Sequence, residues 1–164
     1  MHPYWAAFGE LLKTPFTRID LVWGIVPLYF GLILNELTAD KATFRTAIQT
    51  GFSFLWAGAQ WLYALFHAHG GHLQLTGQSP VRLLVTLLVL AMGAMALFSG
   101  LRKHFSKKLR FLGHTRFANY FMIMIFPIQS HALDWTWTRL LAIALFAIPV
   151  WLLLHFGLIP IRGK

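Results

Sequence analysis

The stretch Ala47–Phe66, AIQTGFSFLWAGAQWLYALF, runs for twenty residues without a charged side chain. About twenty consecutive apolar residues are what an α-helix needs to cross the hydrocarbon core of a bilayer. Four further runs have a similar character, at 19–37, 83–101, 117–133 and 140–159. The sequence therefore predicts an all-α integral membrane protein, folded as a compact bundle of about five transmembrane helices.

The composition supports this class. Of the 164 residues, 57% are hydrophobic and only 12% are charged, which is atypical of a soluble domain. We therefore expect a single polytopic membrane domain over residues 1–164, with the lipid bilayer as its main partner. The net charge of +9 comes mostly from basic residues beside the apolar runs, where they set topology or meet anionic lipid, so we expect no nucleic-acid partner. Without cysteine, the chain has neither disulfides nor thiolate ligands.

The predicted spans differ in quality. The run 117–133 is the weakest, because it is short and contains Pro127, Gln129, Ser130 and His131. A broken or re-entrant helix packed against protein rather than lipid is the expected form of such a run. Proline also interrupts the first span, at Pro27. The second span, 47–66, is expected to lie at the centre of the bundle.

The first eighteen residues form an arm before the first span. Their apolar residues lie near one face of a helix, which predicts a short interfacial helix that lies on the membrane and is closed by Pro15. The alternative is an arm packed on neighbouring helices. The arm lacks the basic stretch and continuous apolar run of a signal peptide, so the spans are expected to remain in the mature protein.

The orientation follows from the basic residues in short loops. The segment 102–116 is the cytoplasmic anchor, because it carries six basic residues: Arg102, Lys103, Lys107, Lys108, Arg110 and Arg116. With five spans, the C-terminus is also cytoplasmic, while the N-terminus and the loop after the second span lie outside. This predicts a multi-pass cell-membrane protein, such as one of a bacterial inner membrane. The same loop could instead form a surface helix that binds anionic lipid or an acidic partner subunit.

A polar stripe follows the second span. At about 100° per residue, one helix face carries its polar and aromatic side chains, namely Gln49, Ser53, Trp56, Gln60, Tyr63 and His67. The opposite face has Gly51 and Gly58, where another helix can approach closely. Polar groups in hydrocarbon need partners, so the stripe is either hydrogen-bonding glue between helices or the lining of a functional cavity.

The stripe leads into FHAHGGHLQLTG, residues 66–77, which holds three of the eight histidines. A metal site is one interpretation of this loop, with ligands drawn from His67, His69, His72, His131 and Asp134. Haem held by His67 and His131 is a second. The third is a polar interfacial loop without a cofactor, and it is favoured because the spacing matches no established metal motif.

These patterns predict a non-catalytic membrane subunit without a cofactor. It would assemble through the polar and glycine faces of its helices, into a homo-oligomer or with another membrane subunit. One alternative is a small transporter or channel that uses the polar face of the second span. The other is a membrane enzyme or redox protein with a histidine metal or haem site at the outer face. No motif specific to a catalytic family occurs in the sequence.

Overall fold

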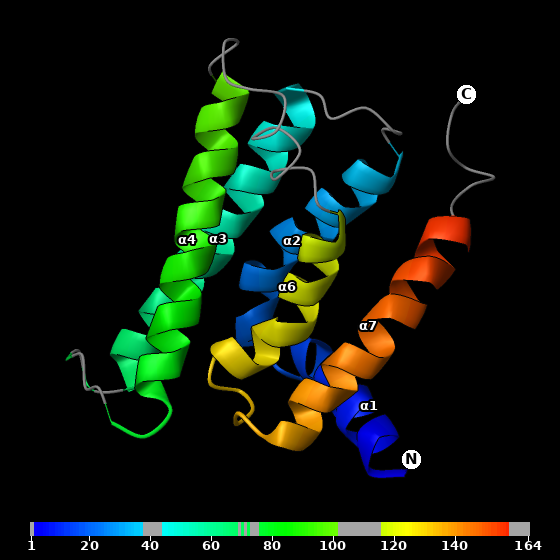
Figure 1. Cartoon of the computed structure of the whole chain (residues 1–164). Helices are drawn as coiled ribbons and strands as arrows, with labels where there is room; N and C mark the ends of the chain where they lie inside the picture. The colour runs from blue at the N-terminus through cyan, green and yellow to red at the C-terminus, as the bar shows by residue number, and fades with distance from the viewer. Residues whose placement is uncertain are drawn as a thin grey trace.

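The computed structural model of the chain describes residues 2–37, 44–68, 70, 72, 76–101 and 116–157 (Figure 1). These residues form the helices α1 (His2–Thr17), α2 (Ile19–Leu37), α3 (Phe44–Ala68), α4 (Ser79–Leu101), α6 (Arg116–Gln129) and α7 (Trp137–Gly157). No strand occurs in this part of the chain. The all-α prediction is confirmed for these residues, and α2 has the predicted bounds.

The length and hydropathy of the helices support fewer spans than the sequence predicts. Among the described residues, α4 is the one helix that is long and apolar enough to cross a membrane by itself. The helices α1 and α2 pass the same criterion only together, as a pair bent by 105°. The fourteen residues of α6 rise only about 20 Å, less than the roughly 30 Å of a hydrocarbon core.

Several helix ends lie together at one end of the molecule in Figure 1. The start of α4, the end of α6 and the start of α7 lie at one end of the molecule, beside α1. A hydrogen bond from Arg82 at the start of α4 to the carbonyl of Ile128 at the end of α6 fixes this arrangement. We call this the Arg82 end.

The N-terminal arm is a helix, but Pro15 does not close it. The helix continues to Thr17, and the amide of Arg18 still donates to the carbonyl of Thr14 at 3.1 Å. Proline near a helix end removes one hydrogen bond without preventing the last turn. The inner face of α1 buries Phe8 and Leu11 against α6 and α7, so the packed-arm alternative describes these contacts.

The most enclosed helix is α6, not the second predicted span. Every described residue of α6 from Asn119 to Gln129 is buried, except Phe121. The helix packs against α1, α2, α3 and α7 and supplies residues to both hydrophobic clusters. The expected packing against protein is therefore confirmed, whereas the central position predicted for 47–66 is wrong.

The same helix is shorter than the predicted span 117–133. It ends at Gln129, because His131 adopts a left-handed backbone conformation with φ of 60°. The amides of Ala132 and Leu133 both donate to the carbonyl of Pro127, which closes the turn. A residue in this conformation is a common helix terminator.

The helices α3 and α4 share the most extensive contact among the described helices. At Gly51, a Cβ atom would lie 2.6 Å from the backbone nitrogen of Leu97 and 2.9 Å from the carbonyl oxygen of Gly93. At Gly58 it would meet the Leu90 side chain at 2.6 Å. The glycine face of the second span is thus a close helix contact, as expected, but its partner is a helix of the same chain.

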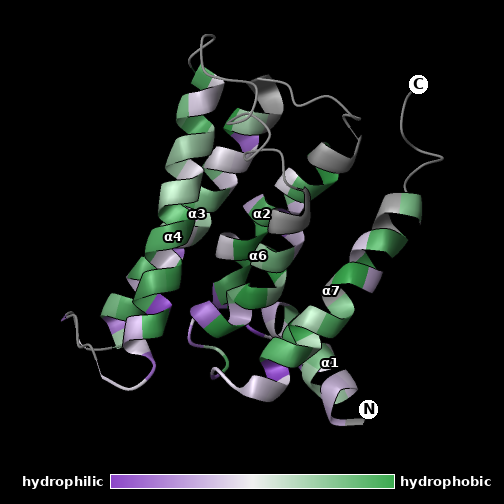
Figure 2. Ribbon diagram, viewed as in Figure 1, coloured by the Kyte–Doolittle hydropathy of each residue, from purple (hydrophilic) through white to green (hydrophobic). Residues whose placement is uncertain are grey.

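The distribution of residues on α4 is the reverse of that on a surface helix of a soluble protein, because its small and polar residues face inward and its large apolar residues face outward. Its buried residues are mainly small or polar: Ser79, Arg82, Thr86, Val89, Gly93, Ala96, Ser99 and Gly100. Its large apolar side chains are exposed, as at Leu84, Leu87 and Phe98. Figure 2 shows most of α4 and α7 coloured as hydrophobic, with hydrophilic residues at the first turn of α4 and the turn after α6.

Candidate functional site at the polar face of α3

The polar stripe of the second span meets α2 where Pro27 interrupts it. Proline has no amide hydrogen, so the carbonyl of Trp23, four residues earlier, loses its partner within the helix. The indole nitrogen of Trp56 donates to this carbonyl, with an Nε1–O distance of 2.9 Å. Trp56 therefore satisfies a backbone acceptor that the proline leaves open.

Ser53 makes a second contact with the same segment of α2. Its hydroxyl oxygen lies 3.1 Å from the carbonyl oxygen of Pro27 and 3.0 Å from that of Gln49. Gly31 allows this approach, because a Cβ atom there would lie 2.8 Å from the Ser53 oxygen. This part of the stripe is hydrogen-bonding glue between two helices, and the face is closed here.

Closer to the Arg82 end, the stripe opens into a pocket of about 250 Å³ between α2, α3 and α6. Its lining residues are Asp20, Leu21 and Gly24 from α2, Gln60, Tyr63 and Ala64 from α3, and Phe126 and Ser130 from α6 and the turn after it. We call this the Asp20 pocket. Neither Gln60 nor Tyr63 uses its side-chain polar group in a hydrogen bond within the described chain.

The last member of the stripe, His67, continues the same face beyond the pocket. Its ring lies against Tyr63, with 3.9 Å between ring centroids, and its Nδ1 atom is 3.3 Å from the Tyr63 carbonyl oxygen. Gln49, at the other end of the stripe, is partly buried. The six stripe residues therefore share one face of α3 as predicted, but they divide between a closed contact and an open pocket.

A second polar site surrounds Arg82, whose side chain is buried although the residue lies only one turn into α4. The residue is 3% exposed. Its guanidinium donates to the carbonyls of Ile128 and Leu133 and to Oε1 of Gln78, the last two at 3.2 Å. The carbonyls at a helix C-terminus carry partial negative charge, so this cation stabilises the end of α6.

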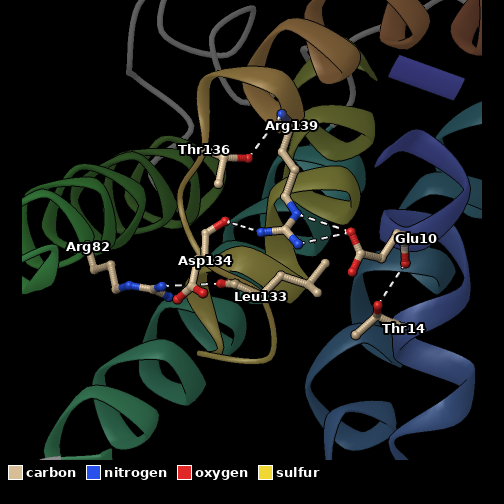
Figure 3. Close-up of polar contacts among 7 residues, drawn as sticks. All are labelled: Glu10, Thr14, Arg82, Leu133, Asp134, Thr136 and Arg139. Atoms are coloured by element: carbon tan, nitrogen blue, oxygen red, sulfur yellow. Dashed lines mark hydrogen bonds and ion pairs between the residues drawn. The ribbon is translucent and has the colours of Figure 1, made fainter. Parts of the chain in front are cut away.

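The turn between α6 and α7 is held from both sides, as Figure 3 shows. Arg139 donates to the carbonyl of Asp134 at 2.8 Å and pairs with the Glu10 carboxylate at 2.9 Å. Gln78 exchanges two hydrogen bonds with the backbone of Trp135, at 3.0 and 3.2 Å. The charges at this end thus fasten α1, α4 and α7 to one turn.

Sequence reasoning did not identify Arg82, Gln78 or Asp20 as site residues. The only signal for Arg82 is a cation immediately before the predicted span 83–101. A charge at that position normally indicates the membrane boundary, and its partners are backbone carbonyls, which no side-chain pattern reveals. Asp20 is recognisable only as an acid at the start of an apolar run.

The histidines do not gather in the described part of the chain. No three histidine, aspartate or glutamate residues there come close enough to hold a metal ion. His67 and His72 are exposed, His131 and Asp134 lie in the turn after α6, and His69 is outside the described residues. The metal interpretation, which includes His69, and the haem interpretation, which uses His67 and His131, both stay predictions.

Most of the basic segment falls outside the structure's described ranges. This applies to Arg102, Lys103, Lys107, Lys108 and Arg110. Arg116 is the first residue of α6. The lipid or partner role of this segment therefore stays a prediction as well.

Comparisons with known proteins give no relative from which a function could be transferred. The chain matches no protein-family model, no curated protein and no solved structure. The functional argument therefore rests on the contacts described above.

Proposed function

We propose that this chain is a non-catalytic integral-membrane subunit of five spans that assembles with a second copy of itself. The observation that carries the membrane assignment is the arrangement of α4, with small and polar residues inside and large apolar residues outside. Water would oppose that arrangement, whereas hydrocarbon favours it. The exposed apolar residues on α2 and α7, such as Trp23, Phe30 and Leu153, support the same assignment.

The proposed assembly surface is the outer face of α4. The glycine face of α3 and the middle of its polar face contact α4 and α2 of the same chain, so neither is open to a partner. The exposed residues of α4 include Leu84, Leu88, Ala91, Met95 and Phe98, spaced four, three, four and three residues apart. This repeat is the seam of a two-helix coiled coil. A second copy would present the same seam about a two-fold axis.

The absence of cysteine makes a direct cross-linking test clean. In lipid nanodiscs, Ala91→Cys is expected to form a disulfide-linked dimer under mild oxidation, because a residue on the seam meets its own copy. Ala144→Cys is the matched control, since Ala144 is also exposed but lies on α7. Mass determination of the unmodified protein should give twice 18.7 kDa. A monomeric mass, or equal cross-linking at both positions, would contradict the homodimer.

A second function is favoured by the Asp20 pocket. A transporter that used the polar face of α3 would take its solute into this pocket, at Gln60 and Tyr63. In that case Gln60→Leu would abolish flux into vesicles without changing the mass of the assembly. The hydrogen bonds of Ser53 and Trp56 to α2 close the path beyond the pocket, so the first function is preferred.

A further inference from the structure

The Asp20 pocket combines one negative charge with aromatic and hydrogen-bonding walls. Its polar lining consists of a carboxylate at Asp20, an amide at Gln60, a phenol at Tyr63 and a hydroxyl at Ser130. Among the described residues, no lysine or arginine lines it. The one charge in this described lining is therefore negative, although the whole chain has a net charge of +9.

The carboxylate of Asp20 has capacity for a further partner. Its Oδ2 atom is 3.2 Å from Nη2 of Arg18, and both side chains are more than half exposed, at 60% and 51%. An exposed pair of this kind is weak, because water competes for both ions. Within the described residues, Oδ1 of Asp20 accepts no hydrogen bond. A cation in the pocket can therefore share the carboxylate with Arg18.

The other residues that line the pocket also suit a cationic ligand. The amide oxygen of Gln60 and the hydroxyl of Ser130 can accept hydrogen bonds from N–H groups. The rings of Tyr63 and Phe126 line the pocket, and aromatic rings attract ammonium ions. The backbone of α2 comes close at Gly24, where a Cβ atom would lie 2.3 Å from the Phe126 ring. This contact keeps the aromatic wall beside the carboxylate.

Two deeply buried polar side chains belong to residues that are adjacent in sequence to residues lining the pocket. Trp61 follows Gln60 in the sequence, is 1% exposed and packs against the Phe126 ring at 5.9 Å. Gln129 precedes Ser130 and is also 1% exposed. Within the described chain, neither the Trp61 indole nitrogen nor the Gln129 amide has a hydrogen-bond partner. Polar groups this deeply buried normally have one.

From these observations we infer that the Asp20 pocket binds a small organic ammonium group. The ammonium lies between the Asp20 carboxylate and the Tyr63 ring and donates hydrogen bonds to Gln60 and Ser130. Its apolar substituent lies against Phe126 and Leu21. This binding goes beyond the proposed assembly, which uses the outer face of α4. A free amine and the ammonium of an aminophospholipid headgroup share this chemistry.

The test uses the full chain in nanodiscs of phosphatidylglycerol, a lipid without an ammonium group. Isothermal titration calorimetry with butylammonium is expected to show saturable binding, whereas butanol and butyrate should show none. Asp20→Asn should weaken the butylammonium affinity about tenfold or more, the loss expected for one charge-assisted hydrogen bond. Gln60→Leu and Tyr63→Leu should also weaken it.

Two matched variants distinguish butylammonium binding in the pocket from the general attraction of cations to anionic lipid. Asp134→Asn removes a carboxylate outside the pocket lining, and Gln49→Leu changes the same helix face away from the pocket. Both should bind butylammonium like the unmodified protein. Circular dichroism checks that each variant remains helical. Absent binding, or equal affinity in the Asp20→Asn and Asp134→Asn proteins, overturns the inference.

The source of the ammonium is distinguished by the lipid. In nanodiscs that contain phosphatidylethanolamine, loss of butylammonium binding identifies the lipid headgroup as the occupant, because the two compete. Retained binding identifies a free amine. Because the dimer is measured separately by mass and by cross-linking at Ala91, the inference can fail while the proposed assembly holds.

Discussion

The helices α4 and α6 show opposite relations between hydrophobicity and burial. The chain's clearest span candidate, α4, exposes most of its large apolar residues and buries an arginine, two serines, a threonine and two glycines. The shorter α6 is enclosed almost completely by other helices. In water, a helix as apolar as α4 would be expected to bury its large apolar residues. The proposed membrane location accounts for this difference, because hydrocarbon favours large apolar residues on the outer surface and leaves interior positions to fit and hydrogen bonding.

The two helices depend on each other at Arg82, and removing this side chain should have the largest effect. Arg82→Met keeps an apolar stem but leaves the carbonyls of Ile128 and Leu133 without their donor. We expect the free energy of unfolding to fall by about 4 to 5 kcal/mol, because three hydrogen bonds of a buried charged group are lost, at roughly 1.5 kcal/mol each. Denaturant titration in mixed micelles, followed by circular dichroism, measures it. Arg18→Met is the control, with a loss of about 0.5 kcal/mol because that pair is exposed.

The next test compares truncations on the two helices directly. Ile125 of α6 is 2% exposed, whereas Leu87 of α4 is 52% exposed. Ile125→Ala should lower the free energy of unfolding by about 3 kcal/mol, because it leaves a cavity in the core. Leu87→Ala should cost less than about 0.5 kcal/mol, since lipid fills the space of the lost methyl groups. If the two losses were similar, Leu87 would have to be covered by protein rather than lipid, although it is not one of the seam residues of the proposed dimer.

The inner face of α4 can be tested through the glycines of α3. Gly51→Ala should cost about 2 kcal/mol, because the new methyl group meets backbone atoms of Leu97 and Gly93 that cannot turn away. Gly58→Ala should cost less, because it meets only the flexible side-chain end of Leu90 at short distance. Thermal unfolding of the two variants in the same detergent gives the comparison. A larger loss at Gly58 would show that the two helices are packed differently.

The features that were predicted correctly from the sequence are those that depend on a local pattern of residues. The bounds of α2 follow from an apolar run between Asp20 and Glu36, and the shared face of the stripe on α3 follows from helical periodicity alone. The weak apolar character of 117–133 correctly indicated packing against protein. Each of these signals lies within one segment.

The errors and omissions depend on contacts between segments. Helical periodicity places Trp56 and Gln60 on the same face and does not distinguish them. In the structure, however, Trp56 donates a hydrogen bond to α2, whereas Gln60 lines a pocket. What separates them is the position of Pro27 on another helix. The role of Arg82 depends in the same way on carbonyls exposed by the end of α6, and that end is set by the conformation of His131. No single run of residues contains this information.

The smallest expected effect isolates the contact between α2 and α3. Trp56→Phe removes the hydrogen bond to the Trp23 carbonyl and should cost about 1 kcal/mol. In a Pro27→Ala background, the new amide at position 27 can bond that carbonyl within α2, so the same change should cost close to nothing. The coupling measured by this double-mutant cycle is therefore expected to be about 1 kcal/mol. Additive effects would mean that the indole stabilises the bundle by packing, and that the open carbonyl at the proline does not determine where α3 docks.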